Sequence, residues 1–148
     1  MSADNQQVTE MRISSDYIRG FVDGEGCFYI LASRRIACEF QVSQKERTVL
    51  DEMQRFFGCG YVKPKYDRSG THVFVVKRIA DLAGVIVPFF KTNLLLVKRY
   101  DFECFAEAVE LQRARAHLTR EGRARIIELK SGTSETLRQA SAHKAGRR

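Results

Sequence analysis

The stretch Gly20-Phe21-Val22-Asp23-Gly24-Glu25-Gly26 places two carboxylates and three glycines at the end of a predicted helix. Acidic side chains at a helix C-terminus oppose the helix dipole, so Asp23 and Glu25 do not serve helix stability. Carboxylates without neighbouring His or Cys suit a hard divalent cation such as Mg2+. The stretch therefore predicts a cation site. The alternative is that it contains ordinary turn glycines beside a solvated helix end.

Gly20 and Gly24 are four residues apart and so fall on one face of the predicted helix. Because they have no side chains, a second helix could approach them backbone to backbone. If that helix came from another copy of the chain and crossed at a two-fold axis, the two Glu25 carboxylates would lie close together. Such a pair would form a two-carboxylate metal cluster at the axis.

The composition is that of one basic domain. The 148 residues include 25 Lys and Arg against 18 Asp and Glu, a net charge of +7, and 44% of them are hydrophobic. Apolar runs such as those at 85–90 and 94–97 are far shorter than the ~20 residues of a membrane span. Residues 2–7 are polar, without a secretory signal, so we expect an intracellular protein that enters no membrane.

The four cysteines form no CxxC pair, which favours free thiols in the core over a zinc site.

Hydrophobic periodicity predicts an α+β domain whose four strands form one twisted sheet with helices on one face. The expected order is a helix from about 16 to 24–26, strands at 27–31 and 36–44, a helix at 45–57, strands at 61–66 and 72–77, and helices at 79–87, 97–116 and 120–130. Pro88 is expected to stop the third helix. The chain then divides into a polar arm at 1–14, the domain at 15–130 and a loosely ordered basic tail at 131–148, with room for one helical turn.

The sequence Tyr17-Ile18-Arg19-Gly20-Phe21-Val22-Asp23-Gly24-Glu25-Gly26-Cys27-Phe28 resembles the signature helix of LAGLIDADG homing endonucleases, in the variant LAGFVDGEGSF. Residues 40–45 resemble the end of the family's second strand, 58–62 the start of its third strand, and 117–132 its C-terminal helix segment. The similarity spans about residues 15–132 in the family's order. It implies an α-β-β-α-β-β-α fold with a four-stranded, antiparallel, saddle-like sheet and helices on one face.

The resemblance implies a metal site in which Glu25, the last acid of the motif, is the ligand and Gly24 lies beside it. Asp23 would have a structural or supporting role. The cofactor implied is Mg2+, with Mn2+ or Ca2+ able to occupy the same sites. Tyr17 and Phe21, with Gly20 and Gly24, would form the dimer interface.

The resemblance also implies two further catalytic residues. Gln44 matches the family's polar active-site position after the second strand. A basic residue before the long helix completes the site, and we choose Lys98 over Lys91. The family often has a second basic residue one helical turn beyond the Gln, but Thr48 stands there, and Arg47 could replace it only if the helix phase allows.

An uncovered sheet face could follow a DNA groove, with outward residues at the base edges and Lys or Arg at phosphates. Strand alternation assigns DNA contacts to Tyr29, Leu31, Ser33, Arg35, Ala37, Glu39 and Gln41 in the first hairpin, and to Lys63, Lys65, Arg68, His72 and Phe74 in the second. Arg34, in the turn of the first hairpin, is expected to contact DNA as well. Each surface cation taken singly is more simply a solubilising charge. The net charge of +7 favours the DNA-binding patch.

The resemblance implies a site-specific endonuclease that acts as a homodimer on double-stranded DNA. Each chain carries one motif, so two chains would supply the carboxylates for a metal-dependent double-strand break in a long, pseudo-palindromic site, to promote intron homing. The alternative is a DNA- or RNA-binding protein of the same fold without cleavage, such as an intron RNA splicing maturase or a transcription regulator. A basic structural protein remains a third interpretation.

Overall fold

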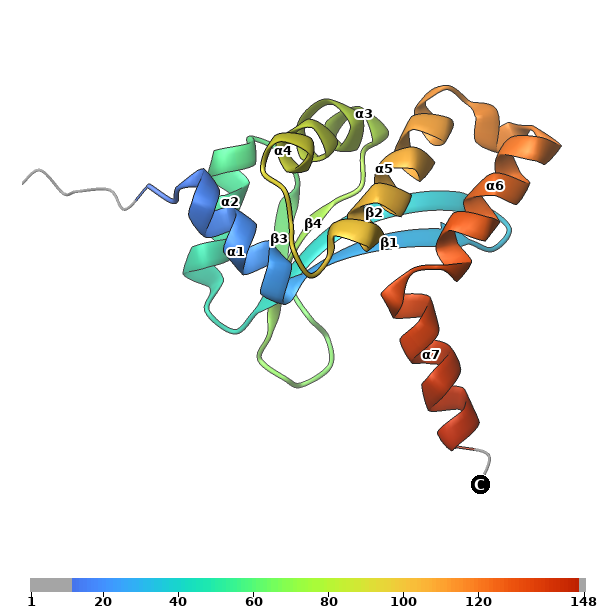
Figure 1. Cartoon of the computed structure of the whole chain (residues 1–148). Helices are drawn as coiled ribbons and strands as arrows, with labels where there is room; N and C mark the ends of the chain where they lie inside the picture. Colours follow the sequence, from blue (N-terminus) through green and yellow to red (C-terminus); the bar gives the residue numbers. More distant parts are fainter. Residues whose placement is uncertain (1–11, 147–148) are drawn as a thin grey trace, which may run out of the picture.

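The computed structural model describes residues 12–146, and Figure 1 shows the arrangement of their elements. The expected arm at 1–14 therefore lies mostly outside the described residues. In chain order the elements are α1 (Ser15–Glu25), β1 (Gly26–Ala32), β2 (Ile36–Gln44), α2 (Arg47–Phe57), β3 (Tyr61–Pro64), β4 (His72–Val76), α3 (Ile79–Asp81), the π-helical segment η1 (Leu82–Ile86), α4 (Val87–Thr92), α5 (Arg99–Arg113), the 3-10 turn η2 (Ala116–Leu118), α6 (Arg120–Ser131) and α7 (Ser134–Ala145).

The four strands form one antiparallel sheet in the order β1-β2-β4-β3, as the α+β prediction requires. The register pairs Phe28 with Phe40 and Val42 with Phe74, so that the apolar side chains of three strands share one face. Helices α2, α5 and α6 pack against this sheet, and Figure 1 shows α3, α4 and α5 on one side of it. Within residues 12–146, no layer of helices covers the other face of the sheet.

A cluster of phenylalanines holds the helices to the sheet. The ring of Phe28 lies 5.3 Å from that of Phe40, 5.6 Å from Phe90 and 5.2 Å from Phe105, measured between centroids. Phe40, Phe90 and Phe105 are fully buried. Removing one such ring typically costs about 3–5 kcal/mol of stability, so this cluster fixes α4 and α5, and the segment between them, above the strands.

The expected stop at Pro88 is wrong, because helical structure continues to Thr92. The segment Leu82–Ile86 is π-helical, and the N–H of Val87 bonds to the carbonyl of Leu82, five residues back. Pro88 then stands in the first turn of α4, where a residue without an N–H group is tolerated.

The expected loosely ordered tail is also wrong for residues 134–145, which form the helix α7. Asp101 on α5 holds its start, since the Asp101 Oδ1 atom accepts hydrogen bonds from Ser134 N at 2.9 Å and Ser134 Oγ at 3.1 Å. Thr133, the residue before α7, is buried. From this anchor α7 extends away from the rest of the domain (Figure 1).

The four cysteines are free thiols, and Cys38 and Cys104 lie in the core as expected. Burial raises the pKa of Cys38 to about 12. Cys27 is instead half-buried on the opposite face of the sheet. Among the described residues, no helix is both long and apolar enough to span a membrane.

Candidate functional site

Helix α1 ends where the sheet begins. Ser14 caps its start by accepting a hydrogen bond from Tyr17 N at 3.1 Å, and Ile18 and Val22 are fully buried beneath it. The chain passes from α1 into β1 through Gly26, where a Cβ atom would lie 2.6 Å from Val22 Cγ1 and 2.8 Å from the Val22 carbonyl oxygen. Only glycine fits this turn, which fixes Glu25 at the edge of the sheet.

Asp23 binds the segment that leads into α5. Its carboxylate accepts hydrogen bonds from the backbone N–H groups of Leu96 at 3.3 Å, Val97 at 2.9 Å and Lys98 at 3.0 Å. Burial opposes ionisation of Asp23, but the hydrogen bonds from Lys98, Val97 and Leu96 outweigh it and lower the pKa of the carboxyl group. Asp23 therefore joins two segments more than 70 residues apart in the chain, which agrees with the supporting role expected for it.

Lys98 lies beside the motif, as its selection over Lys91 requires. Its Nζ atom donates to the carbonyl oxygen of Val22 at 3.3 Å. Burial lowers the pKa of Lys98, while the charges of Asp23 and Glu25 act in the opposite direction. The ammonium group is thus half-buried next to the two acids of the motif.

Glu25 and Lys98 line a cavity of about 470 Å3. The end of α1 contributes Asp23, Gly24 and Glu25, and α5 and α7 contribute Asp101, Ser134 and Arg138. The sheet contributes Cys27, Tyr29, Gln41 and Ser43, which all belong to its uncovered face by strand alternation. The cavity is therefore continuous with the face predicted to bind DNA.

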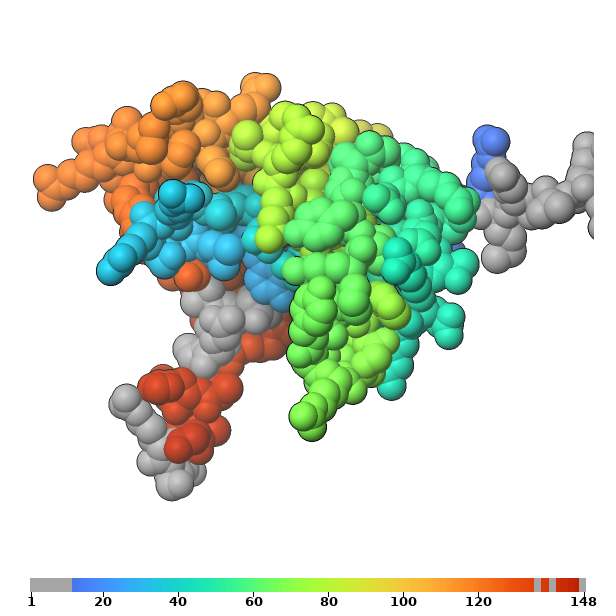
Figure 2. Space-filling model, turned by 180° about the vertical axis from the view of Figure 1, so that it is seen from behind, coloured from blue at the N-terminus to red at the C-terminus, as the bar shows by residue number. Residues whose placement is uncertain are grey.

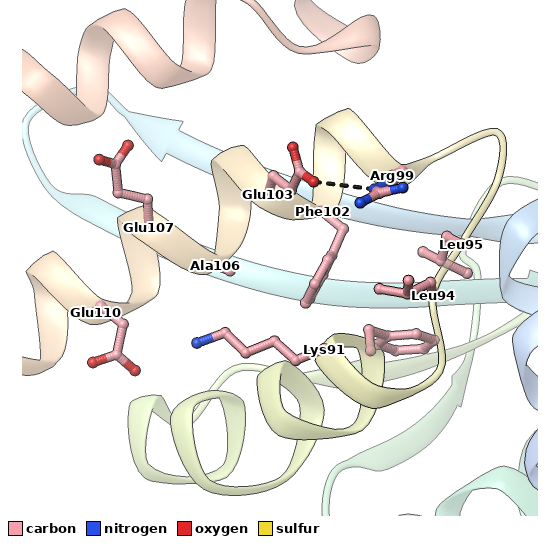
Figure 3. Close-up of a pocket in the computed structure, with 10 residues that line it drawn as sticks. Lys91, Leu94, Leu95, Arg99, Phe102, Glu103, Ala106, Glu107 and Glu110 are labelled. Atoms are coloured by element: carbon pink, nitrogen blue, oxygen red, sulfur yellow. Dashed lines mark hydrogen bonds and ion pairs between the residues drawn. The ribbon is translucent and has the colours of Figure 1, made fainter.

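Lys91 occupies a different place. It lines a cleft of about 410 Å3 between α4 and α5, on the helical side of the domain. Figure 3 shows its side chain extending from α4 toward Glu110 on α5, with Arg99 and Glu103 paired further along the same helix. Lys91 therefore does not share a site with Glu25.

Gln44 is the last residue of β2 and does not line the cavity. Its Oε1 atom accepts a hydrogen bond from Lys45 N at 2.7 Å. Val42, two residues earlier, pairs with Gly26, so the end of β2 lies beside the end of α1.

The basic residue considered on α2 does not reach the cavity either. Arg47 pairs with Asp51 on α2 at 3.3 Å, and Thr48 lines a separate pocket near Tyr17. Helix α2 thus brings no cation to the cavity.

The residues expected to hold a metal supply oxygen donors from one end of α1. Glu25 is exposed there, and the last backbone carbonyls of a helix lack helical partners. The described residues contain no group of three His, Cys, Asp or Glu side chains that could hold an ion. This donor set suits Mg2+ only when a second carboxylate or a phosphate completes it, which a second copy or DNA could provide.

The open face carries most of the side chains predicted for it. Tyr29, Leu31, Ala37, Glu39, Gln41 and Lys63 share the alternation opposite to the core, and Ser33, Arg34, Arg35, Lys65 and Arg68 lie exposed in the two hairpin loops. His72 and Phe74 were placed on the wrong face. Phe74 is fully buried in the core, and Val73 and Val75 point to the open face instead, beside Ser43 and Gln41.

Polar side chains on this face are joined to one another. Glu39 accepts a hydrogen bond from Gln41 Nε2 at 2.7 Å and pairs with Lys77 Nζ at 3.5 Å. The Lys77 pKa is raised by a hydrogen bond to Tyr61 and by the charge of Glu39.

Figures 1 and 2 both show the β3–β4 loop and α7 extending on the same side of the domain, apart from one another.

The expected dimer contact is the exposed side of α1. Tyr17 is 52% exposed and stacks on Phe21, with ring centroids 6.0 Å apart. Gly20 and Gly24 are exposed, and a Cβ atom at either would meet nothing within 4 Å. Helix α1 therefore buries one side in the domain and presents an aromatic and glycine surface on the other.

Comparisons with known proteins agree with this architecture. The family model described as LAGLIDADG endonuclease matches residues 18–109, and the chain belongs to this family. The probable intron-encoded endonuclease 2 of Neurospora crassa is 32% identical over 120 residues, which are 78% of this chain and 26% of that protein. The homing endonuclease I-ApeII of Aeropyrum pernix is 31% identical over 101 residues, 63% of this chain and 60% of that protein.

Solved structures show the same fold. The homing endonuclease I-TnaI superposes with a TM-score of 0.77 at 30% identity, covering 91% of this chain and 99% of that one. The meganuclease I-SmaMI bound to uncleavable DNA gives 0.76 at 25% identity, covering 83% of this chain and 46% of that one. The curated relatives above are longer than the part this chain matches, which is 26% of one and 60% of the other.

Sequence reasoning missed one side of the cavity, which Asp101, Ser134 and Arg138 provide. Signals for α7 were present: Thr133 is an N-cap residue type, and His143 and Lys144 lie in the last turn, where cations favour a helix. The contact from Asp101 crosses 33 residues and has no local signature.

Proposed function

We propose that this chain is a homing endonuclease that cuts both strands of DNA as a homodimer with Mg2+. The observation that carries the proposal is the cavity shared by Glu25 and Lys98 at the end of α1, open to the uncovered sheet face. The family and the fold support an endonuclease. The meganuclease I-SmaMI, which has this fold, was solved bound to DNA, and this supports DNA as the substrate.

Each group at the site has a distinct task in this proposal. Glu25 and the backbone at Gly24 hold the cation, which when bound supplies a water of lowered pKa and charge at the leaving oxygen. Lys98 directs its ammonium group at the scissile phosphate and neutralises charge that develops there. Gln44 lies outside the cavity, at the end of β2 beside the end of α1, and would orient the attacking water from there. Asp23 keeps Lys98 in place.

The homodimer follows from the number of carboxylates. One chain brings one Glu25, whereas cleavage of two strands requires two such sites. The exposed surface of Tyr17, Gly20, Phe21 and Gly24 allows two α1 helices to approach closely. The chain covers 46% of the DNA-bound I-SmaMI chain, so two copies would match its length.

The paired sheets would contact a long, pseudo-palindromic duplex. Tyr29, Glu39 and Gln41 face base edges, and the loops with Arg34, Arg35, Lys65 and Arg68 meet phosphates. Relatives named as intron-encoded endonucleases support a role in intron homing, in the compartment that holds the intron. A protein that binds DNA or RNA without cutting, as a maturase or regulator does, is the competing function.

Cleavage of a randomised duplex library with Mg2+ tests the proposal. Wild-type protein should cut at one partly palindromic sequence and lose this activity in EDTA. Glu25→Gln should bind the same sequence without cutting it, while Glu110→Gln, which removes an exposed acid that pairs with Arg113, should cut like the wild type. Selective binding without metal-dependent cutting would replace the enzyme by the maturase or regulator.

A further inference from the structure

Arg138 brings a second cation to the cavity that holds Glu25 and Lys98. It lies on α7, four residues after Ser134, and both line this cavity. Residues four apart share a helix face, so the face of α7 that Asp101 anchors is also the face that lines the cavity. The charge of Arg138 reaches Lys98, whose pKa it lowers in addition to the larger effect of burial.

The position of Arg138 depends on a chain of contacts that starts at the motif. Asp23 holds the residues before α5, and Asp101, in the first turn of α5, holds Ser134 at the start of α7. Gly132 packs on Tyr100, since a Cβ atom there would lie 2.9 Å from the tyrosine hydroxyl. The first turn of α7 is therefore built on the same segment that positions Lys98.

Lys98 and Arg138 line the cavity together with three carboxylates, of which Asp23 and Asp101 already accept hydrogen bonds from backbone N–H groups. With Glu25 on the metal ion, as the proposed function has it, Lys98 and Arg138 are the two cations of the lining that face an incoming phosphate. Their mutual repulsion falls when a phosphate lies between them, and an arginine can bind phosphate oxygens through two parallel hydrogen bonds. No residue of α2 lines this cavity, and Arg47 pairs with Asp51. We propose that Arg138 contacts the scissile phosphate together with Lys98, so that α7 completes the cleavage site. This inference rests on the proposed function.

The test uses the full chain with Arg138→Gln, which keeps most of the side-chain length, and Arg138→Lys, which keeps the charge. Arg113→Gln is the matched control, because Arg113 pairs with Glu110 at the far end of α5. Single-turnover cleavage with Mg2+ should slow about 10- to 100-fold for Arg138→Gln. Arg138→Lys should recover part of this loss, and Arg113→Gln should equal the wild type.

Binding measured with Ca2+ over a range of NaCl concentrations separates this inference from the proposed function. The slope of log affinity against log salt should fall by about one per protomer in Arg138→Gln and stay unchanged in Arg113→Gln. A slope and a cleavage rate equal to those of Arg113→Gln would overturn the role of Arg138. If the wild type binds DNA but never cuts, the proposed function fails, and the salt slope alone decides whether Arg138 contacts a phosphate.

Discussion

The cavity at the end of α1 and the cleft between α4 and α5 contain similar side chains but differ in how their charges are balanced. In the cleft, Lys91 lies among Glu103, Glu107 and Glu110, and each of these acids pairs with an arginine, at 3.2, 2.9 and 3.4 Å. In the cavity, backbone N–H groups bind Asp23, and Glu25 is exposed at a helix C-terminus. A cavity that contains Lys and Glu is therefore not by itself a functional site. It becomes one when its charged groups can still bind a ligand after their local ion pairs and hydrogen bonds have formed.

The first prediction contrasts the two lysines. Lys98→Ala should lower the single-turnover cleavage rate about 100- to 1000-fold, because its ammonium group would no longer stabilise charge at the phosphate. Lys91→Ala should change the rate less than about twofold, as is usual for exposed surface charges. Equal losses in both variants would mean that the cavity is not the cleavage site.

The second prediction concerns the exposed surface of α1, through which the proposed homodimer would form. Gly20→Leu should raise the dimer dissociation constant about 10- to 100-fold, since the added side chain separates the two helices. Sedimentation equilibrium measures this constant directly.

Gly84→Leu is the matched control. A Cβ atom at Gly84 also meets nothing within 4 Å, but Gly84 belongs to η1 and not to α1. An unchanged dissociation constant for Gly20→Leu would mean that the two α1 helices do not pair and would leave the site with one carboxylate.

The third prediction concerns stability. Asp23→Asn should lower the free energy of unfolding at pH 7 by about 1–2 kcal/mol, because a neutral acceptor replaces a charged one at three backbone N–H groups. Urea unfolding measures the change. Asp51→Asn, which lies within α2 and loses a surface pair with Arg47 at 3.3 Å, should change stability by less than about 0.5 kcal/mol.

The same pair of variants gives a pH dependence. The pKa of Asp23 is lowered in the folded protein, so its stabilising effect is complete above the ordinary value of 3.8 and is lost as the pH falls through the lower folded value. The stability difference between wild type and Asp23→Asn should therefore shrink in acid. A difference that is constant from pH 7 down to the acid limit would contradict the hydrogen bonds of Asp23.

Local patterns predicted the parts of the fold that depend on neighbours in sequence. The limits of β2 at Ile36 and Gln44 were predicted without error, because one face of the strand is buried and the apolar residues alternate. Strand β4 was assigned to the wrong phase. It is a central strand with Val73, Phe74, Val75 and Val76 all buried, and a strand buried on both faces has no alternation to read.

Parts of the site that depend on contacts distant in sequence could not be predicted. Glu25 was predicted from the motif and Lys98 from the basic position before the long helix, but the binding of Asp23 to residues 96–98 and of Asp101 to Ser134 joins segments with no shared local signal. The π-helical turn before Pro88 was missed for a related reason. A proline normally ends a helix, and only the altered hydrogen bond from Val87 to Leu82 allows this one to continue.

A mixture of two chains tests the central claim, that a double-strand break requires the Glu25 residues of two chains. Wild-type and Glu25→Gln chains would be co-expressed in equal amounts, and limiting protein would be added to a plasmid that carries the target. If both Glu25 residues of a dimer are needed, the linear product should fall to about one quarter of the wild-type amount, the fraction of dimers with two wild-type chains under random pairing. Linear product at about one half would show that a single wild-type chain cuts both strands and would contradict the homodimer.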